Sequence, residues 1–185
     1  MYRHYHFDSS ALAICDNLHI PHHWSFAKVA ARGKSSTGWF YGLKLHAAIN
    51  HHGELLSIKV TPGNIDDRKP VAFLCHGLFG RVYADKGYVA RWLVDLLRSR
   101  QLELITKVRR NMKPVQHTSF DQALLKRRSL IETVFDELKN LCQIEHTRHR
   151  SHANFIVNLM SGIVAYCLMP NKPQLSISSC APACR

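Results

Sequence analysis

The order of its periodic segments constrains the fold of this 185-residue chain more than any other feature. Two alternating segments, 39–49 and 54–61, flank a His-His-Gly turn and predict an antiparallel hairpin. Further along, short apolar segments at 81–85 and 102–108 predict strands that alternate with amphipathic stretches. Antiparallel strands followed by strand–helix alternation predict an α/β fold, in which helices flank a mixed sheet.

The remaining segments complete this order. The opening residues predict a strand that ends at Asp8. The basic, aromatic-containing stretch 21–38 predicts a loop, which either contacts a DNA backbone or is solvated surface. Either Asp66 or Asp67 is expected to cap the first helix. Apolar periodicity predicts helices at 69–78, 89–100, 120–141 and 155–168. We therefore expect one domain over residues 1–170, followed by a disordered tail at 171–185.

The charge of the chain indicates the class of its partner. Lys and Arg number 25 against 13 Asp and Glu, which gives a formal net charge of +12 and favours nucleic acid as the partner. The sequence has no apolar run long enough to span a membrane and no apolar leader, so we expect no membrane association and a cytoplasmic location. Its six cysteines form no CxxC pair, which argues against a zinc ribbon.

Three carboxylates stand where such a fold could bring them together. Asp8 and Asp85 end predicted strands, and Glu132 shares one face of a predicted helix with Arg128 and Lys139. Carboxylates suit Mg²⁺, and two such ions can drive phosphodiester cleavage. The residues alone leave an alternative open, in which Asp8 caps a turn, Asp85 makes a local turn, and Glu132 pairs with a neighbouring cation on a solvated helix face.

Longer motifs favour the catalytic interpretation. They are FDSSALAIC, ARGKSSTGWFYGLKLHAAIN, GELLSIKVTPGNIDDRKP, YADKGY, LITKVRRNMK and RRSLIETVFDELKNLCQIEHTRHRS, spread over about residues 7–175. These segments resemble the catalytic region of bacterial insertion-sequence transposases of the DDE class, in particular the insertion sequence 982 family. The resemblance implies a ribonuclease-H-like fold, and a DNA transposase that hydrolyses phosphodiesters and transfers strands.

The resemblance also assigns roles to residues. Asp8, Asp85 and Glu132 match the catalytic, metal-binding triad, which implies two Mg²⁺ or Mn²⁺ ions. Arg128, Glu132 and Lys139 match the family's Y-x2-R-x3-E-x6-K signature, although Leu125 stands at its tyrosine position. The basic residues expected to contact DNA are Arg128, Lys139, Lys107, Arg109, Arg110, Lys113, Arg148 and Arg150. Transposon ends and target DNA are the implied partners, with a homo-oligomer on DNA in the bacterial nucleoid. Separately, the segment 33–36 (GKSS) lacks the first glycine of a phosphate-binding loop, so we expect no nucleotide cofactor.

Two further expectations concern completeness and aromatic residues. Only seven residues precede Asp8, so we expect that the family's end-recognising N-terminal region is missing and that Asp8 is the triad member most prone to displacement. An inactive fragment that binds only DNA or full-length transposase is therefore the alternative function, and a structure-specific nuclease is a third. Trp39 and Tyr41 alternate on one strand, which favours sheet packing over base stacking.

Overall fold

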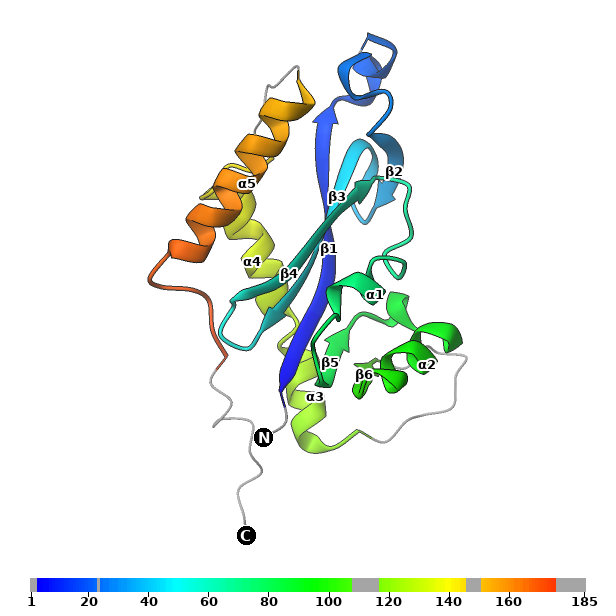
Figure 1. Cartoon of the computed structure of the whole chain (residues 1–185), viewed down its shortest axis with the longest axis vertical. Helices are drawn as coiled ribbons and strands as arrows, with labels where there is room; N and C mark the ends of the chain where they lie inside the picture. Colours follow the sequence, from blue (N-terminus) through cyan, green and yellow to red (C-terminus); the bar gives the residue numbers. More distant parts are fainter. Residues whose placement is uncertain (1–2, 23, 108–116, 146–150, 176–185) are drawn as a thin grey trace.

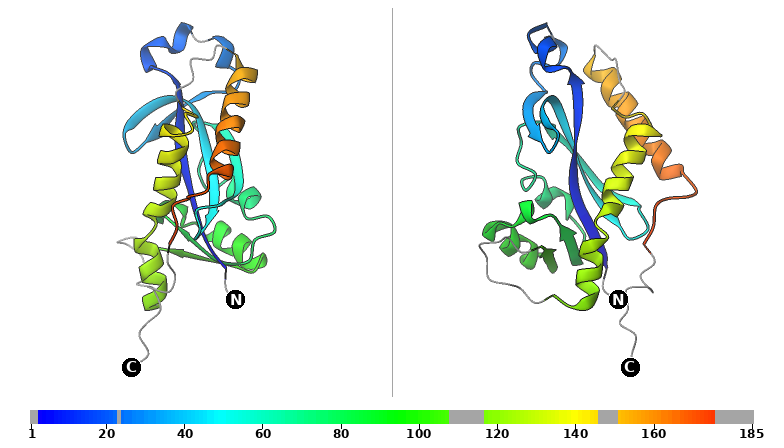
Figure 2. Two further views of the ribbon diagram at one scale, coloured as in Figure 1. Left: turned by 90° about the vertical axis from the view of Figure 1, so that its left-hand side faces the viewer. Right: turned by 180° about the vertical axis from the view of Figure 1, so that it is seen from behind.

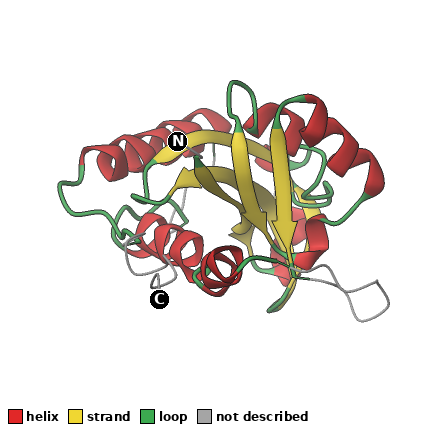
Figure 3. Ribbon diagram, turned by 90° about the horizontal axis from the view of Figure 1, so that it is seen from below, coloured by secondary structure: helices red, strands yellow, loops and turns green. Residues whose placement is uncertain are grey.

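A six-stranded sheet with helices on both faces forms the body of the protein in the computed structural model, which describes residues 3–22, 24–107, 117–145 and 151–175 (Figures 1 and 3). The strands are β1 (His4–Cys15), β2 (Ala31–Ser35), β3 (Gly38–Asn50), β4 (Leu55–Pro62), β5 (Gly80–Ala84) and β6 (Leu102–Thr106). The α-helices are α1 (Val71–Leu74), α2 (Arg91–Ser99), α3 (Ser119–Lys126), α4 (Ser129–Asn140) and α5 (His152–Leu168). Short 3₁₀ helices are η1 (Asn17–His22), η2 (Trp24–Phe26) and η3 (Lys86–Tyr88).

The strand order confirms the predicted mixed sheet. β3 pairs antiparallel with β1 along one edge, while β2 and β4 share its other edge. β1 then pairs with β5, and β5 with β6, in parallel. The predicted hairpin of β3 and β4 therefore lies in the antiparallel half, which β1 and β2 complete. The parallel half contains β5 and β6, which are joined through α2.

Two apolar cores lie on opposite faces of this sheet. On one face, α4 and α5 pack against β1 and β3 through a cluster that includes Leu12, Leu45 and Leu138. On the other face, α1 and α2 cover β1, β5 and β6 through a cluster that includes Phe7 and Leu93. Figure 2 shows α4 and α5 lying together along their face of the sheet.

The predicted single helix over 120–141 is wrong, because the chain breaks it between α3 and α4 at Arg127 and Arg128. Neither Gly nor Pro marks this break. The bend serves two different packing partners: Leu124 and Leu125 of α3 join Tyr83 and Ile105, whereas α4 packs on the β1–β3 core. Leu125, at the tyrosine position of the signature, is thus a core residue.

Several predicted boundaries also change. β1 continues past Asp8 to Cys15, and residues 31–35 of the predicted loop form β2, because both segments find pairing partners along β3. Neither Asp66 nor Asp67 caps α1, whose N-cap is Pro70 without a side-chain hydrogen bond. Asp66 instead accepts a hydrogen bond from the backbone amide of Arg68 at 2.9 Å and tightens the turn before α1.

Part of the expected tail lies against the body. The amide of Leu175 donates a hydrogen bond to the carbonyl of His51 at 2.8 Å, and its side chain contacts the core. Residues 176–185 lie outside the described part of the chain. Among the helices of the described residues, none has the length and apolarity needed to cross a membrane.

Candidate active site

Asp8 and Asp85 stand at the same level of two neighbouring parallel strands. His6 of β1 pairs with Tyr83 of β5, and each aspartate follows its paired residue by two positions. Because side chains alternate along extended chain, Asp8 and Asp85 are both expected to point to the sheet face on which α3 and α4 lie. β5 ends at Ala84, so β1 loses its partner on this side at the level of Asp8, and the site opens there.

Arg128 stands among the three predicted carboxylates. Its Nη1 atom lies 3.4 Å from Oδ1 of Asp85 and 3.9 Å from Oδ2 of Asp8. Its Nη2 atom donates a hydrogen bond of 2.9 Å to Oε1 of Glu132. One guanidinium therefore brings together residues from β1, the end of β5 and α4, which are far apart in sequence.

The break between α3 and α4 produces this arrangement. Arg128 is the N-cap residue of α4, and Glu132 lies in the first turn of that helix, one turn further along. An acidic side chain in a first turn also interacts favourably with the positive end of the helix dipole. In a continuous helix, Arg128 and Glu132 would still share one helix face. Such a helix would not, however, have brought α4 against β1.

Asp8 occupies the most desolvated position of the three. Its side chain is 21% exposed, against 45% for Asp85 and 57% for Glu132. Burial raises the pKa of the Asp8 carboxyl to about 6, although the amide of Ser9 donates a hydrogen bond to it at 2.8 Å and Arg128 counteracts the rise. Asp8, the triad member expected to be most prone to displacement, thus lies beside the other two carboxylates.

The donor chemistry of this cluster suits a divalent cation. Three carboxylates supply hard oxygen ligands, and the position between them already attracts a positive group. Within the described ranges, however, no three such side chains are close enough together to share a metal ion. A metal ion at this position would compete with the Arg128 guanidinium for the same carboxylate oxygens.

The structure describes only some of the basic residues that are expected to bind DNA, and these have different surroundings. Lys139 donates a hydrogen bond of 2.7 Å to the carbonyl of Ala11 and forms an ion pair of 2.8 Å with Glu145, so it fastens α4 to β1. Lys107 is exposed just beyond β6. The other predicted contacts, Arg109, Arg110, Lys113, Arg148 and Arg150, lie outside the described residues.

A cleft of about 710 Å³ extends from the two aspartates, and most of its lining was missed by the sequence analysis. Gly33 of β2 and Gly63 of the loop after β4 approach so closely that a Cβ on Gly33 would lie 2.2 Å from the Gly63 carbonyl oxygen. Besides Asp8 and Asp85, the lining includes Arg32, Lys34, Trp39, Lys44, Asp66, Asp67 and Arg68. The predicted β3–β4 hairpin and the Pro-Gly-Asn turn were the signals that could have located it.

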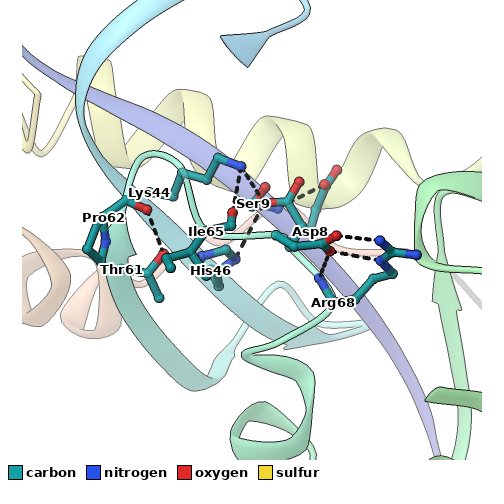
Figure 4. A network of polar contacts seen from close by, with 10 residues as sticks. Asp8, Ser9, Lys44, His46, Thr61, Pro62, Ile65 and Arg68 are labelled. Atoms are coloured by element: carbon teal, nitrogen blue, oxygen red, sulfur yellow. Dashed lines mark hydrogen bonds and ion pairs between the residues drawn. The ribbon is translucent and has the colours of Figure 1, made fainter. Parts of the chain in front are cut away.

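A polar network fixes the loop at the edge of this cleft (Figure 4). Lys44 donates hydrogen bonds to the carbonyl of Ile65 at 3.0 Å and to Oδ1 of Asp67 at 2.9 Å. The buried ring of His46 forms a hydrogen bond of 2.8 Å with the hydroxyl of Thr61, and its Nδ1 lies 4.0 Å from Asp67. These contacts hold the loop against β3 and orient Asp67 toward the sheet.

His46 makes the stability of the protein sensitive to acid. Burial lowers its pKa from 6.5 to about 4, so the unfolded state takes up its proton first as the pH falls. Its contribution to stability is complete above pH 6.5 and is lost between about pH 6.5 and 4, a loss of roughly 3 kcal/mol. We expect denaturant unfolding to show a weaker fall over this range for His46→Gln than for the parent.

Other groups with shifted pKa values, His6 and Asp8 among them, also contribute in acid, so the comparison depends on matched variants. Burial also lowers the pKa of His6 to about 4, which adds to the acid sensitivity, whereas the raised pKa of Asp8 opposes it. His22→Gln alters an exposed histidine and serves as the control. An unchanged pH profile in His46→Gln would contradict the assignment.

Comparison with known proteins gives the family of the chain. The family model described as "Transposase DDE domain" matches residues 3–152. A putative transposase for insertion sequence element IS6501 from Brucella ovis is 34% identical over 103 residues, which cover 55% of this chain and 78% of that protein.

One solved structure shares the fold. A piggyBac transposase synaptic complex with hairpin DNA aligns over 89% of this chain with a TM-score of 0.57 and 12% identity, and the chain spans 45% of that transposase. The catalytic core of BIV integrase aligns over 88% of this chain with a TM-score of 0.46 and 11% identity. The predicted ribonuclease-H-like fold is confirmed.

Proposed function

The chain belongs to the transposase DDE domain family, and from this premise we propose that Asp8, Asp85 and Glu132 are its catalytic, metal-binding carboxylates. The proposed reaction is hydrolysis of a phosphodiester at the end of an insertion sequence, followed by attack of the released 3′-hydroxyl on target DNA. Atoms balance in both steps, because water or the 3′-hydroxyl adds at phosphorus while a DNA oxygen leaves with a proton. Membership of the insertion sequence 982 group is the finer proposal, carried by the motifs alone.

The convergence of three carboxylates on Arg128 carries this proposal. Surface acids that only cap turns or pair with a sequence neighbour are not expected to converge from three separate elements on the same cation. The alternative of three independent structural roles therefore accounts poorly for the observed distances.

Divalent ions, Mg²⁺ or Mn²⁺ and two in number, are proposed to activate the attacking oxygen and stabilise the leaving oxygen. Asp8 and Asp85 would hold them from neighbouring strands, and Glu132 would complete the ligand set from α4. The chain's own residues position the DNA: Arg128, once displaced from the carboxylates, can contact a phosphate beside the reacting one. The net charge of +12 attracts the DNA to this surface.

Nicking of supercoiled plasmid and of labelled oligonucleotides tests the proposal. We expect strand breaks with Mg²⁺ or Mn²⁺ and none with EDTA, and joined products when target DNA is present. Cleavage without joining would identify a nuclease of the same fold. Salt-sensitive binding without metal-dependent cleavage would contradict the catalytic proposal and identify a DNA-binding fragment. Analytical ultracentrifugation with and without DNA tests the proposed homo-oligomer.

A further inference from the structure

Trp39 differs from the other aromatic residues at the start of β3. The sequence predicts that Trp39 and Tyr41 both pack on the sheet, and Tyr41 does so, with 7% of its surface exposed. Trp39 is 56% exposed and lines the cleft that contains Asp8 and Asp85. Packing therefore leaves more than half of the indole available at the candidate active site.

Two cations accompany this ring. Lys34 pairs directly with Trp39 across the β2–β3 hairpin, and Arg32 lies two positions along the same strand. The guanidinium carbon of Arg32 lies 5.2 Å from the ring centroid and the ammonium nitrogen of Lys34 lies 5.9 Å from it, both within cation–π range. The hairpin thus presents an aromatic ring and two positive charges on one face.

The two cations carry charge that other residues do not neutralise. In the part of the chain that the structure describes, neither Arg32 nor Lys34 has a carboxylate oxygen within ion-pair distance. By contrast, Lys44 is paired with Asp67, and Arg68 with Asp66, in the same cleft. The unneutralised charge is therefore concentrated beside the exposed ring.

We propose that Trp39, Arg32 and Lys34 bind one unpaired nucleotide of the DNA strand next to the reacting phosphate. Its base stacks on the indole, and its phosphates contact the two cations. A base in a duplex has both faces covered by its neighbours, so this site selects a nucleotide that has left the helix. The cleft, at about 710 Å³, is large enough to admit a nucleotide.

This inference rests on the proposed function, because only a DNA-cleaving site gives the unpaired nucleotide a place beside Asp8 and Asp85. It adds a selection step to that function. A duplex whose end stays paired would bind to the positively charged surface, but none of its bases would stack on Trp39.

Tryptophan fluorescence tests the proposal without altering Trp39. The chain contains three tryptophans, so a Trp24→Phe/Trp92→Phe variant reports on Trp39 alone. In EDTA, a short oligothymidylate is expected to quench this emission, while a blunt duplex of equal length quenches it weakly. Absence of quenching at saturating oligothymidylate overturns the proposal.

Binding measurements in EDTA provide the second arm. Trp39→Ala is expected to weaken binding of oligothymidylate by about 5- to 150-fold, as for one stacked base, while duplex binding changes by less than about twofold. Trp39→Phe retains a ring and is expected to bind close to the parent. Trp92→Ala is the matched control, because Trp92 is 49% exposed on α2 and does not line this cleft.

The outcomes separate this inference from the proposed function. Equal losses of single-strand and duplex binding in Trp39→Ala, with an intact circular dichroism spectrum, overturn the stacking site but leave metal-dependent nicking in place. Selective quenching by oligothymidylate in a protein that never nicks DNA supports the stacking site and contradicts the catalytic proposal alone.

Discussion

Replacing Asp85 by asparagine is expected to abolish metal-dependent nicking while leaving the protein folded. The substitution keeps the shape of the side chain but removes one charged oxygen from the proposed metal site. Metal ions contribute several kcal/mol of transition-state stabilisation in such reactions. A loss of about 4 kcal/mol corresponds to a rate reduction on the order of 1,000-fold.

The fold should tolerate this change for a structural reason. The Asp85 side chain is 45% exposed, and its ion pair with Arg128 spans 3.4 Å. An ion pair with that much solvent contact contributes less than about 1 kcal/mol, so the thermal midpoint should fall by only a few degrees.

Asp95→Asn is the matched control for this experiment. Asp95 is an exposed aspartate on α2, so its replacement removes the same charge away from the cleft. Nicking rates are measured with Mg²⁺ and with Mn²⁺ for both variants. An Asp85→Asn protein that nicks at the parental rate would falsify the assignment of this carboxylate.

The sequence predicted the parts of the fold that local patterns determine. The hairpin of β3 and β4, the strands β5 and β6, and the helix α2 follow from alternation, turn chemistry and apolar periodicity, and all are present. The level of Asp85 relative to Asp8 follows from strand order, because equivalent positions of parallel neighbours lie side by side.

Tertiary packing determined what the sequence did not show. The break between α3 and α4 has no Gly or Pro to mark it, and it exists because Leu124 and Leu130 bury into different clusters. β2 is a short strand whose pairing with β3 depends on the close approach of Gly33 to Gly63. Arg128 lies among the three carboxylates because of that break. The helical pattern of the sequence predicted only that Arg128 shares a helix face with Glu132.

Arg128→Met is expected to have opposite effects on the metal-free and metal-bound protein. The guanidinium lies among three carboxylates, and its own side chain is 27% exposed. Replacing Arg128 leaves the three negative charges facing one another without a cation between them, and Asp8 is the most desolvated of the three. Because Asp85 and Glu132 are more than a third exposed, we expect a loss of only about 1–2 kcal/mol without metal.

Metal binding should become tighter in the same variant. A divalent ion no longer competes with a fixed positive charge for the same oxygens, and the relief of repulsion favours its binding. We expect the dissociation constant for Ca²⁺ or Mn²⁺ to fall by roughly tenfold, or about 1.4 kcal/mol. The shift of the thermal midpoint with metal concentration measures this constant for parent and variant.

Arg91→Met provides the control, because it removes an exposed arginine of α2 and leaves the carboxylate cluster intact. Weaker metal binding in Arg128→Met would show that the guanidinium orients the ligands rather than competes with the ion. Tighter binding together with weaker DNA binding would support exchange: the metal takes the carboxylates, and Arg128 moves to a phosphate. In that case metal binding and DNA binding at this site depend on each other through a single side chain.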